Sequence, residues 1–447
     1  MEDNKKSLEE MFDDYNLSRY QKVIIVFCAL VAMLDGFDTQ VIAFAAPAIA
    51  NDWAANLAAF GPVFSSALFG GLIGALIFGP LGDRVGRKPA LIGAVLIMSI
   101  GSLLTPLCGD VSTLTLVRFF TGIGLGGALP NFITLTAEYS PKHLRATIVP
   151  VMYCGFPLGA IIGGAVASQL ISAFGWGSVF LMGGILPLLL VPALIVFLPE
   201  SVRFLARERK REKIDLILSR MGRSGVWDGE LAAPEKESKV PVKDIFRDGR
   251  LSGTLGIWLV FFSSLLLTYF MVNWLPLVAQ SSGFGPEDAV LAVVLLNLGA
   301  VCGTVLIGRL GDRVGQGIVV SLAYAIGFLA ITALGKIGHS VSLLFALTFL
   351  SGFFSIGAQI CTVAICTNLY DVTTRATGTG WAMGAGRVGA IVGPVVGGVL
   401  IGAEVGFPTL FLIAGMASLF CSLTVFLVAR VARRSPAHSR FELDAYK

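Results

Sequence analysis

Long apolar runs, each followed by a short polar segment, form the dominant pattern along the chain. A helix needs about 20 apolar residues to cross a bilayer. The predicted helices cover residues 23–46, 58–80, 90–108, 114–137, 147–172, 177–198, 253–278, 288–308, 317–335, 341–369, 378–402 and 407–429. These runs are continuous and lack the alternation typical of membrane β-barrel strands. The pattern therefore predicts an all-α membrane protein with twelve transmembrane helices.

The basic residues lie almost entirely on one side of these predicted helices. With an even number of helices, both termini, the central loop and every second connecting loop share one side. Those segments hold 30 Lys and Arg residues, whereas the opposite loops hold only Lys336. Because basic loops stay in the cytoplasm, we expect cytoplasmic termini and a cytoplasmic central loop. The predicted parts are an N-terminal segment (1–22), a six-helix bundle (23–198), the central loop (199–252), a second six-helix bundle (253–429) and a tail (430–447).

The two predicted bundles repeat one another at a nearly constant offset. Gly79–Lys88 matches Gly308–Gly317 at offset 229, and two further matches follow at offset 230. These further pairs are Arg145-Ala-Thr with Arg375-Ala-Thr, and Leu158–Gly164 with Val388–Pro394. Both copies have the same orientation, which makes this a parallel repeat. Such repeats place a ligand site near the bilayer midplane and move by rocking one half against the other.

Composition excludes several classes of protein. Hydrophobic residues make up 55% of the chain and charged residues only 14%, against about 25% charged in a soluble domain. No polar stretch is long enough for a catalytic domain, and the seven cysteines show no metal-ligand spacing. The basic run 207–213 lies in a loop of nearly balanced charge, so we expect a helix at the membrane surface. We predict no enzyme, no metal, no cofactor except the proton, and no nucleic-acid partner.

The segment Gly79-Pro-Leu-Gly-Asp-Arg-Val-Gly-Arg-Lys88 resembles the loop 2–3 signature of the major facilitator superfamily. Glycines in it allow close backbone approach, and a carboxylate can sit near a helix N-terminus. The second copy has Gln316 and Gly317 in place of the last two bases, so we expect it to be the weaker gate. Together with Glu138, which the resemblance adds, the gate candidates are Gly82, Asp83, Arg84, Gly86, Arg87, Asp312 and Arg313.

Only four charged residues fall well inside the predicted spans: Asp35, Asp38, Arg118 and Arg387. Each costs about 2.5–3.5 kcal/mol at a helix centre, so each must be paired, hydrated or used. Asp35 and Asp38 share one helix face at i, i+3 spacing, and two adjacent carboxylates favour holding a proton. They are the proton-coupling candidates, unless one of them simply pairs with an arginine.

The two arginines admit different interpretations. A guanidinium stays charged and binds carboxylates bidentately, and Arg387 is therefore the first candidate for gripping an anionic substrate. Arg118 lies near the outer end of its predicted helix, close to where that helix begins. It either contacts the substrate or pairs with an acid of the first helix and governs proton release. The sequence leaves open which arginine binds the carboxylate.

Several motifs narrow the resemblance to the aromatic acid:proton symporter family. They are Asp35-Gly-Phe-Asp38, Arg118–Pro130 followed by Asn131, Glu138-Tyr139, Pro199–Phe204 and Gly378–Gly389. The resemblance implies rocker-switch import of benzoate-type anions with protons across a bacterial inner membrane, by a chain that functions as a monomer. Aromatic and amide residues that could line the substrate site are Phe37, Asn131, Tyr153, Phe156, Asn273, Trp274, Gln359 and Trp381.

Two other functions remain open at this point. Gly389–Gly398 resembles an antiporter signature of the superfamily, but it lies in the eleventh predicted helix instead of the fifth. We interpret it as close helix packing through small residues. An exporter of aromatic or amphiphilic compounds and a membrane sensor without transport are the alternatives. The accepted aromatic acid, the proton stoichiometry and the oligomeric state do not follow from the sequence.

Overall fold

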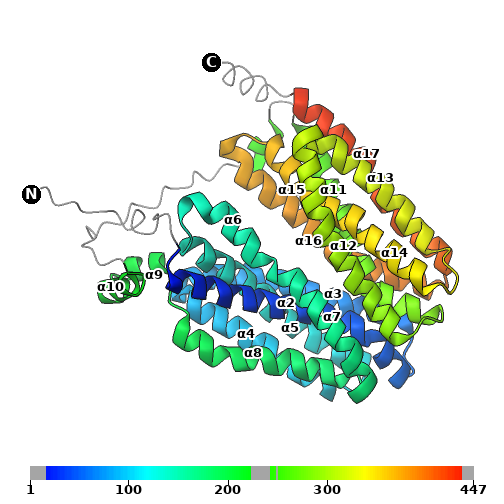
Figure 1. Ribbon diagram of the computed structural model, residues 1–447, viewed down its shortest axis with the longest axis horizontal. Helices are drawn as coiled ribbons and strands as arrows, with labels where there is room; N and C mark the ends of the chain where they lie inside the picture. The colour runs from blue at the N-terminus through cyan, green and yellow to red at the C-terminus, as the bar shows by residue number, and fades with distance from the viewer. Residues whose placement is uncertain (1–16, 223–241, 248–249, 435–447) are drawn as a thin grey trace, which may run out of the picture. The chain divides into compact units, whose positions relative to one another are not determined.

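The computed structural model describes residues 17–222, 242–247 and 250–434, and it is helical wherever it is regular (Figure 1). Within these residues, twelve segments are long and apolar enough to cross a membrane, which confirms the predicted number. Parts of the predicted N-terminal segment, central loop and tail lie outside the described residues. Since no bilayer is present, the predicted cytoplasmic side of the termini stays a prediction.

The first six candidate spans run from α2 to α8. They are α2 (Arg19–Asp52), η1 with α3 (Leu57–Ala59, Phe60–Val85), α4 with η2 (Arg87–Leu104, Thr105–Leu107), α5 (Val111–Glu138), α6 with α7 (Lys142–Tyr153, Gly155–Phe174) and α8 (Gly177–Phe197). The Asp110 side chain caps α5 by accepting from the Thr113 amide at 2.9 Å, as expected for an acidic N-cap.

The predicted fifth helix is interrupted. It was expected to run unbroken over 147–172, but α6 ends at Tyr153 and α7 begins at Gly155. Pro157 explains the break, because a proline has no N–H to bond the carbonyl of the residue four positions earlier, here Tyr153. The interruption matters because Tyr153 and Phe156, two candidate site residues, flank it.

The central loop contains two short helices, α9 (Val202–Arg207) and α10 (Arg211–Arg220), and the 3-10 helix η3 (Val242–Phe246). One face of α10 is buried through Ile214, Ile217 and Leu218, which join the hydrophobic core shared with α2, α4 and α5. Its charged residues Arg211, Lys213 and Arg220 are exposed. The last three residues of the basic run, Arg211–Lys213, are thus part of an amphipathic helix anchored on the protein.

The remaining spans lie after the central loop. They are α11 (Leu251–Ser281), α12 (Pro286–Val314), α13 (Gln316–Leu334), α14 with η4 and α15 (Val341–Ser351, Gly352–Ile356, Gly357–Leu369), α16 (Val372–Gly402) and α17 (Phe407–Arg434). The predicted helix 341–369 contains one π-helical turn, η4, a feature that commonly marks a functional part of a helix. Helix α11 packs along α16 and α17, and α13 packs along α17.

The chain divides into two compact units. Unit 1 comprises Met1–Val41, Ser66–Gly163 and Trp176–Lys239, and unit 2 comprises Ile42–Ser65, Gly164–Gly175 and Val240–Lys447. Unit 2 therefore includes the end of α2, the start of α3 and the end of α7 in addition to the helices after the central loop. The units differ from the two predicted six-helix bundles in these three segments.

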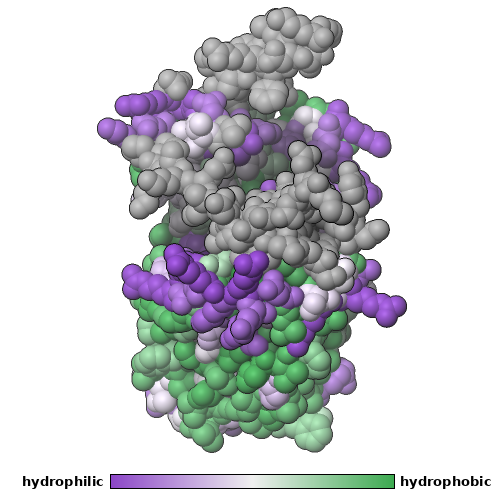
Figure 2. Space-filling view, turned by 90° about the vertical axis from the view of Figure 1, so that its left-hand side faces the viewer, coloured by the Kyte–Doolittle hydropathy of each residue, from purple (hydrophilic) through white to green (hydrophobic). Residues whose placement is uncertain are grey.

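Large hydrophobic side chains cover much of the exterior. Leu76 and Leu189 are each 68% exposed, and Leu329 is 62% exposed. Figure 2 shows one face on which green hydrophobic residues form a broad surface and purple hydrophilic residues gather in bands. Such extensive apolar exposure is expected for helices that contact lipid.

Candidate functional site

A buried ion pair joins two of the four intramembrane charges. Arg118 Nη1 on α5 lies 3.4 Å from Asp38 Oδ2 on α2, and their side chains are 1% and 0% exposed. The side chain of Phe180 on α8 lies against the guanidinium, with its ring centroid 5.1 Å from Arg118 Cζ. Taking two charges out of water is costly unless they are paired and hydrogen-bonded, and both conditions hold here. Arg118 is thus committed to a partner inside unit 1.

Three hydroxyl groups also bond the guanidinium, whose Nε has no hydrogen-bond partner in the described chain. Arg118 Nη2 donates to Thr105 Oγ1 at 2.8 Å, Thr121 Oγ1 at 3.0 Å and Ser102 Oγ at 3.3 Å. Ser102 Oγ also donates to Asp38 Oδ1. Helices α4 and α5 approach closely here because Gly101 has no side chain, since a Cβ at Gly101 would collide with the Thr121 hydroxyl.

Helix α2 is positioned by glycines as well. A Cβ at Gly36 would collide with the Phe156 carbonyl, and one at Gly159 with the Met33 carbonyl. The next contact along these helices is made by Phe37, which is 4% exposed and would collide with a side chain at Gly163. Close packing of α2 against α7 thereby fixes the register of the Asp35-Gly-Phe-Asp38 segment. Asp35 is 3% exposed and accepts from Thr39 Oγ1 at 3.4 Å.

An aromatic stack marks the break between α6 and α7. The rings of Tyr153 and Phe156 stack at 5.7 Å with an interplanar angle of 10°. Tyr153 also stacks on Phe132 at 6.5 Å. Both Tyr153 and Phe156 are half-buried, so part of each side chain remains exposed. The interrupted helix offers flat aromatic surface of the kind on which a substrate ring packs.

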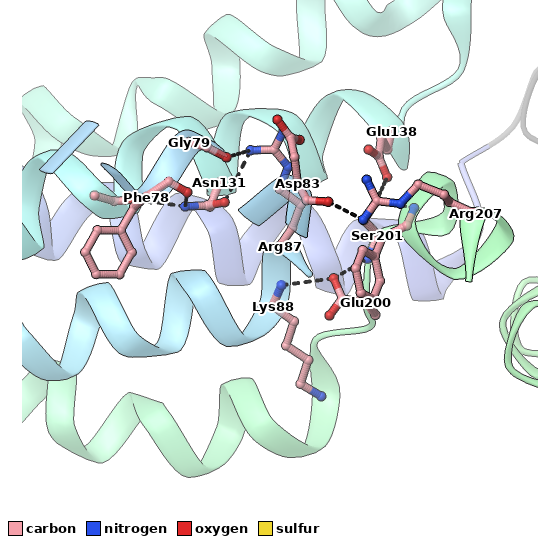
Figure 3. Close-up of polar contacts among 12 residues, drawn as sticks. Phe78, Gly79, Asp83, Arg87, Lys88, Asn131, Glu138, Glu200, Ser201 and Arg207 are labelled. Atoms are coloured by element: carbon pink, nitrogen blue, oxygen red, sulfur yellow. Dashed lines mark hydrogen bonds and ion pairs between the residues drawn. The ribbon is translucent and has the colours of Figure 1, made fainter. Parts of the chain in front are cut away.

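The first gate copy is a dense polar cluster in unit 1 (Figure 3). Asp83 at the end of α3 pairs with Arg87 at the start of α4. Arg87 Nη1 also donates to the Gly79 carbonyl at 3.3 Å and to Asn131 Oδ1 at 3.4 Å. The Asn131 amide donates in turn to the carbonyls of Phe78 and Gly127 at 3.2 and 2.9 Å. Asn131, a candidate for substrate contact, is thus engaged within the gate cluster.

A second layer of the cluster comes from the segment before α9. Glu200 Oε1 accepts from the Lys88 amide at 3.1 Å and so caps the N-terminus of α4, where negative charge is favourable. Ser201 Oγ donates to Glu138 Oε2 at 2.7 Å, and Arg207 donates to the Asp83 carbonyl. The exposed Arg84 lies beside Asp83 in sequence.

Tyr139 connects the same segment to the end of α5. Its hydroxyl donates to the Glu200 carbonyl at 2.7 Å, and its own carbonyl accepts from Gln21 Nε2 at 2.9 Å. Burial raises the pKa of Tyr139 well above the ordinary value of a tyrosine, so the hydroxyl keeps its proton. The start of α2, the end of α5 and the segment before α9 are thereby held together.

The second gate copy repeats the backbone of the first with fewer charges. Gly86 and Gly315 occupy the same position of the repeat and have φ angles of 109° and 113°, a region that glycine tolerates. At the position of Arg87 the second copy has Gln316, which donates to Asp312 Oδ1 at 3.2 Å. Arg313 is exposed. A neutral amide thus replaces the ion pair of the first copy.

Arg387 differs from Arg118 in its burial and in its bonding partners. It lies on α16 and is half-buried, and within the described part of the chain its side chain has no ion pair or hydrogen bond. An unpaired guanidinium in a membrane helix is expensive, which favours a functional use. Within the described chain, Arg387 of unit 2 is thus unpaired, whereas Arg118 of unit 1 is paired.

The face of α16 that carries Arg387 is packed against other residues at one end and open at the other. One turn beyond it, the Ile391 carbonyl accepts from Ser65 Oγ on α3 at 2.7 Å. Further along, a Cβ at Gly398 would lie 2.9 Å from the Ala58 carbonyl. One and two turns before Arg387, no heavy atom of the described chain lies within 4 Å of a Cβ built at Gly384 or Gly380. Arg387 therefore marks the boundary between a closed and an open stretch of this face.

Other glycines of α16 pack against α11. Side chains at Gly389 and Gly393 would collide with the carbonyls of Phe262 and Leu266. The glycine run that resembles an antiporter signature thus serves as a close helix contact, in agreement with the interpretation from the sequence.

The other candidates of unit 2 have the following surroundings. Trp274 is 1% exposed, donates to the Pro394 carbonyl at 3.0 Å and meets Phe64 edge-on at 5.3 Å. Asn273 donates to the Tyr269 carbonyl at 2.7 Å. Gln359 is half-buried two residues after the start of α15. Trp381 is 48% exposed and stacks on Trp258 at 5.8 Å.

The sequence did not single out Ser102, Thr105 or Thr121, because isolated hydroxyl residues in apolar helices give no specific signal. Glu200 and Ser201 lay within a motif of the resemblance, but their contacts depend on which helix ends meet. Within the described residues, no group of three His, Cys, Asp or Glu side chains is arranged to hold a metal ion.

Comparison with known proteins identifies the family. The model of the Major Facilitator Superfamily matches residues 28–334 and 288–444. The chain belongs to the Major Facilitator Superfamily. This confirms the predicted superfamily, and membership in a family with transporter relatives also confirms that the chain is not an enzyme.

Relatives within the superfamily cover almost the whole chain. The chain is 37% identical over 427 residues to the gallate transporter of Pseudomonas putida, with 94% of each chain covered. It is 37% identical over 401 residues to the 4-hydroxybenzoate transporter PcaK of Pseudomonas putida, covering 88% of this chain and 89% of the relative. A crystal structure of a D-xylose-proton symporter has a TM-score of 0.69 at 20% identity, with 91% and 97% covered. That likeness confirms the fold alone.

Proposed function

We propose that this protein imports aromatic carboxylates of the benzoate and hydroxybenzoate type together with protons. It would work by rocker-switch alternating access in a bacterial inner membrane, as a monomer and with no cofactor except the proton. The observation that carries the proposal is the contrast between the two intramembrane arginines. Arg118 is paired with Asp38, whereas Arg387 has no partner in the described chain.

Arg387 is the substrate anchor in this proposal. A guanidinium binds a carboxylate through two parallel hydrogen bonds, and the space beside Gly384 and Gly380 is open for the attached ring. The contact between Ile391 and Ser65 closes the other direction along α16. Relatives named for gallate and 4-hydroxybenzoate transport support an aromatic acid as the substrate.

Asp38 is the proton-binding group, with Asp35 one helical turn before it. A proton reaches Asp38 when its ion pair with Arg118 opens, and protonation removes the negative charge. One monoanion on Arg387 and one proton on Asp38 together leave the net charge of the transport path unchanged. The loaded and the empty carrier can then change conformation, while half-loaded forms are held back by an uncompensated charge.

The gate residues hold one end of unit 1 in this scheme. The ion pair of Asp83 with Arg87 and the contacts of Glu138, Glu200 and Arg207 link α3, α4, α5 and α9. These links must yield or move as a body when the carrier changes state. The second copy, with its neutral Gln316, gives way more easily.

Uptake by purified protein in proteoliposomes tests the proposal. With an inwardly directed proton gradient, labelled 4-hydroxybenzoate accumulates, and a protonophore abolishes the accumulation. Uptake that ignores the gradient contradicts proton coupling. Accumulation only under an outwardly directed gradient indicates an exporter, and saturable binding without flux indicates a sensor.

A further inference from the structure

The partners of Arg118 differ in how closely they bind it. Its shortest hydrogen bonds go to Thr105 Oγ1 at 2.8 Å and Thr121 Oγ1 at 3.0 Å. The contact with Asp38 Oδ2 is longer, at 3.4 Å. A bond near 2.8 Å is close to ideal, whereas one of 3.4 Å is at the limit for a hydrogen bond. The shortest hydrogen bonds of the guanidinium are therefore those with neutral oxygens, and they add to its ion pair with the carboxylate.

The two threonines are oriented as acceptors. Thr105 Oγ1 donates to the Gly101 carbonyl at 2.9 Å, and Thr121 Oγ1 donates to the Val117 carbonyl at 2.8 Å. Each hydroxyl has one proton and two lone pairs, so the lone pairs are left for Arg118. These bonds do not depend on the charge of Asp38, because both proton positions are fixed within α4 and α5.

Ser102 occupies a different position from the threonines. Its Oγ donates to Asp38 Oδ1 and accepts from Arg118 Nη2 at 3.3 Å, so it bridges the two charged groups. A serine hydroxyl rotates freely and can either donate or accept. It can therefore donate to the carboxylate and accept from the carboxylic acid, following Asp38 through both protonation states.

These contacts remove the usual difficulty of protonating one member of a buried ion pair. Neutralising Asp38 would ordinarily leave Arg118 as an uncompensated buried charge, which is strongly unfavourable. Here the guanidinium keeps two well-formed bonds to the threonines. It also keeps the face of Phe180 at 5.1 Å, a favourable position for a cation.

We propose that Ser102, Thr105 and Thr121 form a hydroxyl cradle that holds Arg118 in place while Asp38 gains and loses its proton. Asp38 is then the moving member of the pair, and the three hydroxyl residues are positioning residues for proton coupling. In the step itself a proton from water binds one Asp38 carboxylate oxygen, and it returns to water after the conformational change. This inference rests on the proposed function, because the cradle matters only if transport is coupled to protons.

Few other titratable groups surround Asp38 in the described chain. Asp35 lies one turn earlier on α2, and Arg118 faces Asp38 from α5. Cys108, after η2, interacts electrostatically with Arg118 and with the exposed Asp110. Helix α8 contributes Phe180 and Gly183, which do not titrate. Substitutions in the cradle can therefore alter the pH response of the pair without removing either of its charged groups.

The test is the pH profile of uptake by the full-length protein in proteoliposomes. The probe is whichever of benzoate, 4-hydroxybenzoate and gallate the wild type accumulates. Initial uptake is measured over a series of external pH values at fixed internal pH, and the midpoint of the profile is compared among variants. Substrate exchange at equal pH on both sides serves as a second measurement, since it requires no net proton movement.

The cradle predicts shifts of opposite sign. Ser102→Ala removes a hydrogen-bond donor to the charged Asp38 carboxylate. Asp38 then stays protonated up to a higher pH, and the midpoint of the uptake profile rises by about one pH unit. Thr121→Val and Thr105→Val leave Arg118 more dependent on the carboxylate, so the midpoint falls by a similar amount. Thr121→Ser keeps the oxygen and restores the wild-type midpoint. All four variants retain substrate exchange.

Thr115→Val is the matched control. Thr115 lies on the same helix as Thr121 and donates to the Val111 carbonyl at 2.7 Å, but in the described chain it makes no hydrogen bond with Arg118. Its variant should keep the wild-type midpoint. A purely structural role for the threonines would lower the uptake rate of their valine variants without moving the midpoint, and would overturn the cradle. Shifts of the same sign in Ser102→Ala and Thr121→Val would overturn it as well.

The outcome also separates the cradle from the proposed function. If uptake by the wild type does not respond to an imposed proton gradient, proton coupling itself fails. If the wild type responds but the cradle variants keep its midpoint, only the cradle fails. A valine variant that does not fold is replaced by the comparison of Thr121→Ser with Ser102→Ala, in which only the latter shifts.

Discussion

Arg118 and Arg387 are both arginines in glycine-rich membrane helices, yet their surroundings are opposite. Arg118 is 1% exposed and bonded to Asp38 and three hydroxyls of unit 1. Arg387 is half-buried in unit 2 without a partner in the described chain. The difference arises because α2, α4, α5 and α8 enclose Arg118. On α16, by contrast, the contact with α3 begins only one turn after Arg387, at Ile391. One arginine is therefore suited to coupling and the other to binding.

The largest expected effect is on stability. Arg118→Gln leaves Asp38 buried without its cation, and we expect the free energy of unfolding to fall by about 3–5 kcal/mol. Arg387→Gln should change it by less than about 1 kcal/mol, because no native bond is lost. Unfolding in detergent measures both values. The double variant Asp38→Asn with Arg118→Gln should recover most of the loss. Equal destabilisation by the two single variants would erase the contrast.

The next effect concerns substrate affinity. Arg387→Gln removes charge-assisted hydrogen bonds to the carboxylate, and binding of 4-hydroxybenzoate should weaken by roughly 10- to 100-fold. Arg387→Lys keeps the charge but loses the bidentate geometry, and its loss should be intermediate. Arg375→Gln, an exposed arginine of the same helix, is the control and should bind within about twofold of the wild type. Equilibrium binding of labelled acid to detergent-purified protein reports these values. Wild-type affinity in Arg387→Gln would remove Arg387 from the binding site.

A smaller effect is expected beside Arg387. Gly384→Val fills the open space next to Gly384, and the affinity for hydroxylated benzoates should fall by about tenfold, with gallate affected more than benzoate. Val395→Ile adds bulk at an exposed position about three turns further along α16 and should leave the affinities unchanged. Competition of labelled 4-hydroxybenzoate by unlabelled acids measures the ratios. Equal loss for all acids would indicate distortion of α16 instead of a steric contact with the ring.

The smallest effect concerns the contact one turn beyond Arg387. Ser65→Ala removes the hydrogen bond to the Ile391 carbonyl, worth about 1 kcal/mol, or roughly fivefold in a conformational equilibrium. In an Ala58→Cys background, alkylation of the new cysteine should become about fivefold faster, because Ala58 lies against Gly398 and Gly402. Ser66→Ala, at the neighbouring position of α3, is the comparison variant. An unchanged alkylation rate would mean that this bond does not hold the segment closed.

Helix-level features were largely predictable, and contacts between helices were not. The apolar runs located the twelve spans, and the repeat anticipated the matching glycines at 86 and 315, whose φ angles are 109° and 113°. The break at Tyr153 was missed, although Pro157 was visible, because prolines also occur within intact membrane helices such as α5 and α11. Asn131 was proposed to face substrate because its amide is polar, but both ends of that amide serve the Arg87 cluster.

By itself the sequence determined how many helices cross the membrane, where the charges inside them lie and that the halves repeat. These properties depend on hydrophobicity and spacing along a single chain. Only the tertiary structure decided which arginine is paired and which is free. That decision depends on the close approaches that Gly36, Gly101 and Gly159 allow, because the packing of whole helices determines which side chains meet in a medium without water.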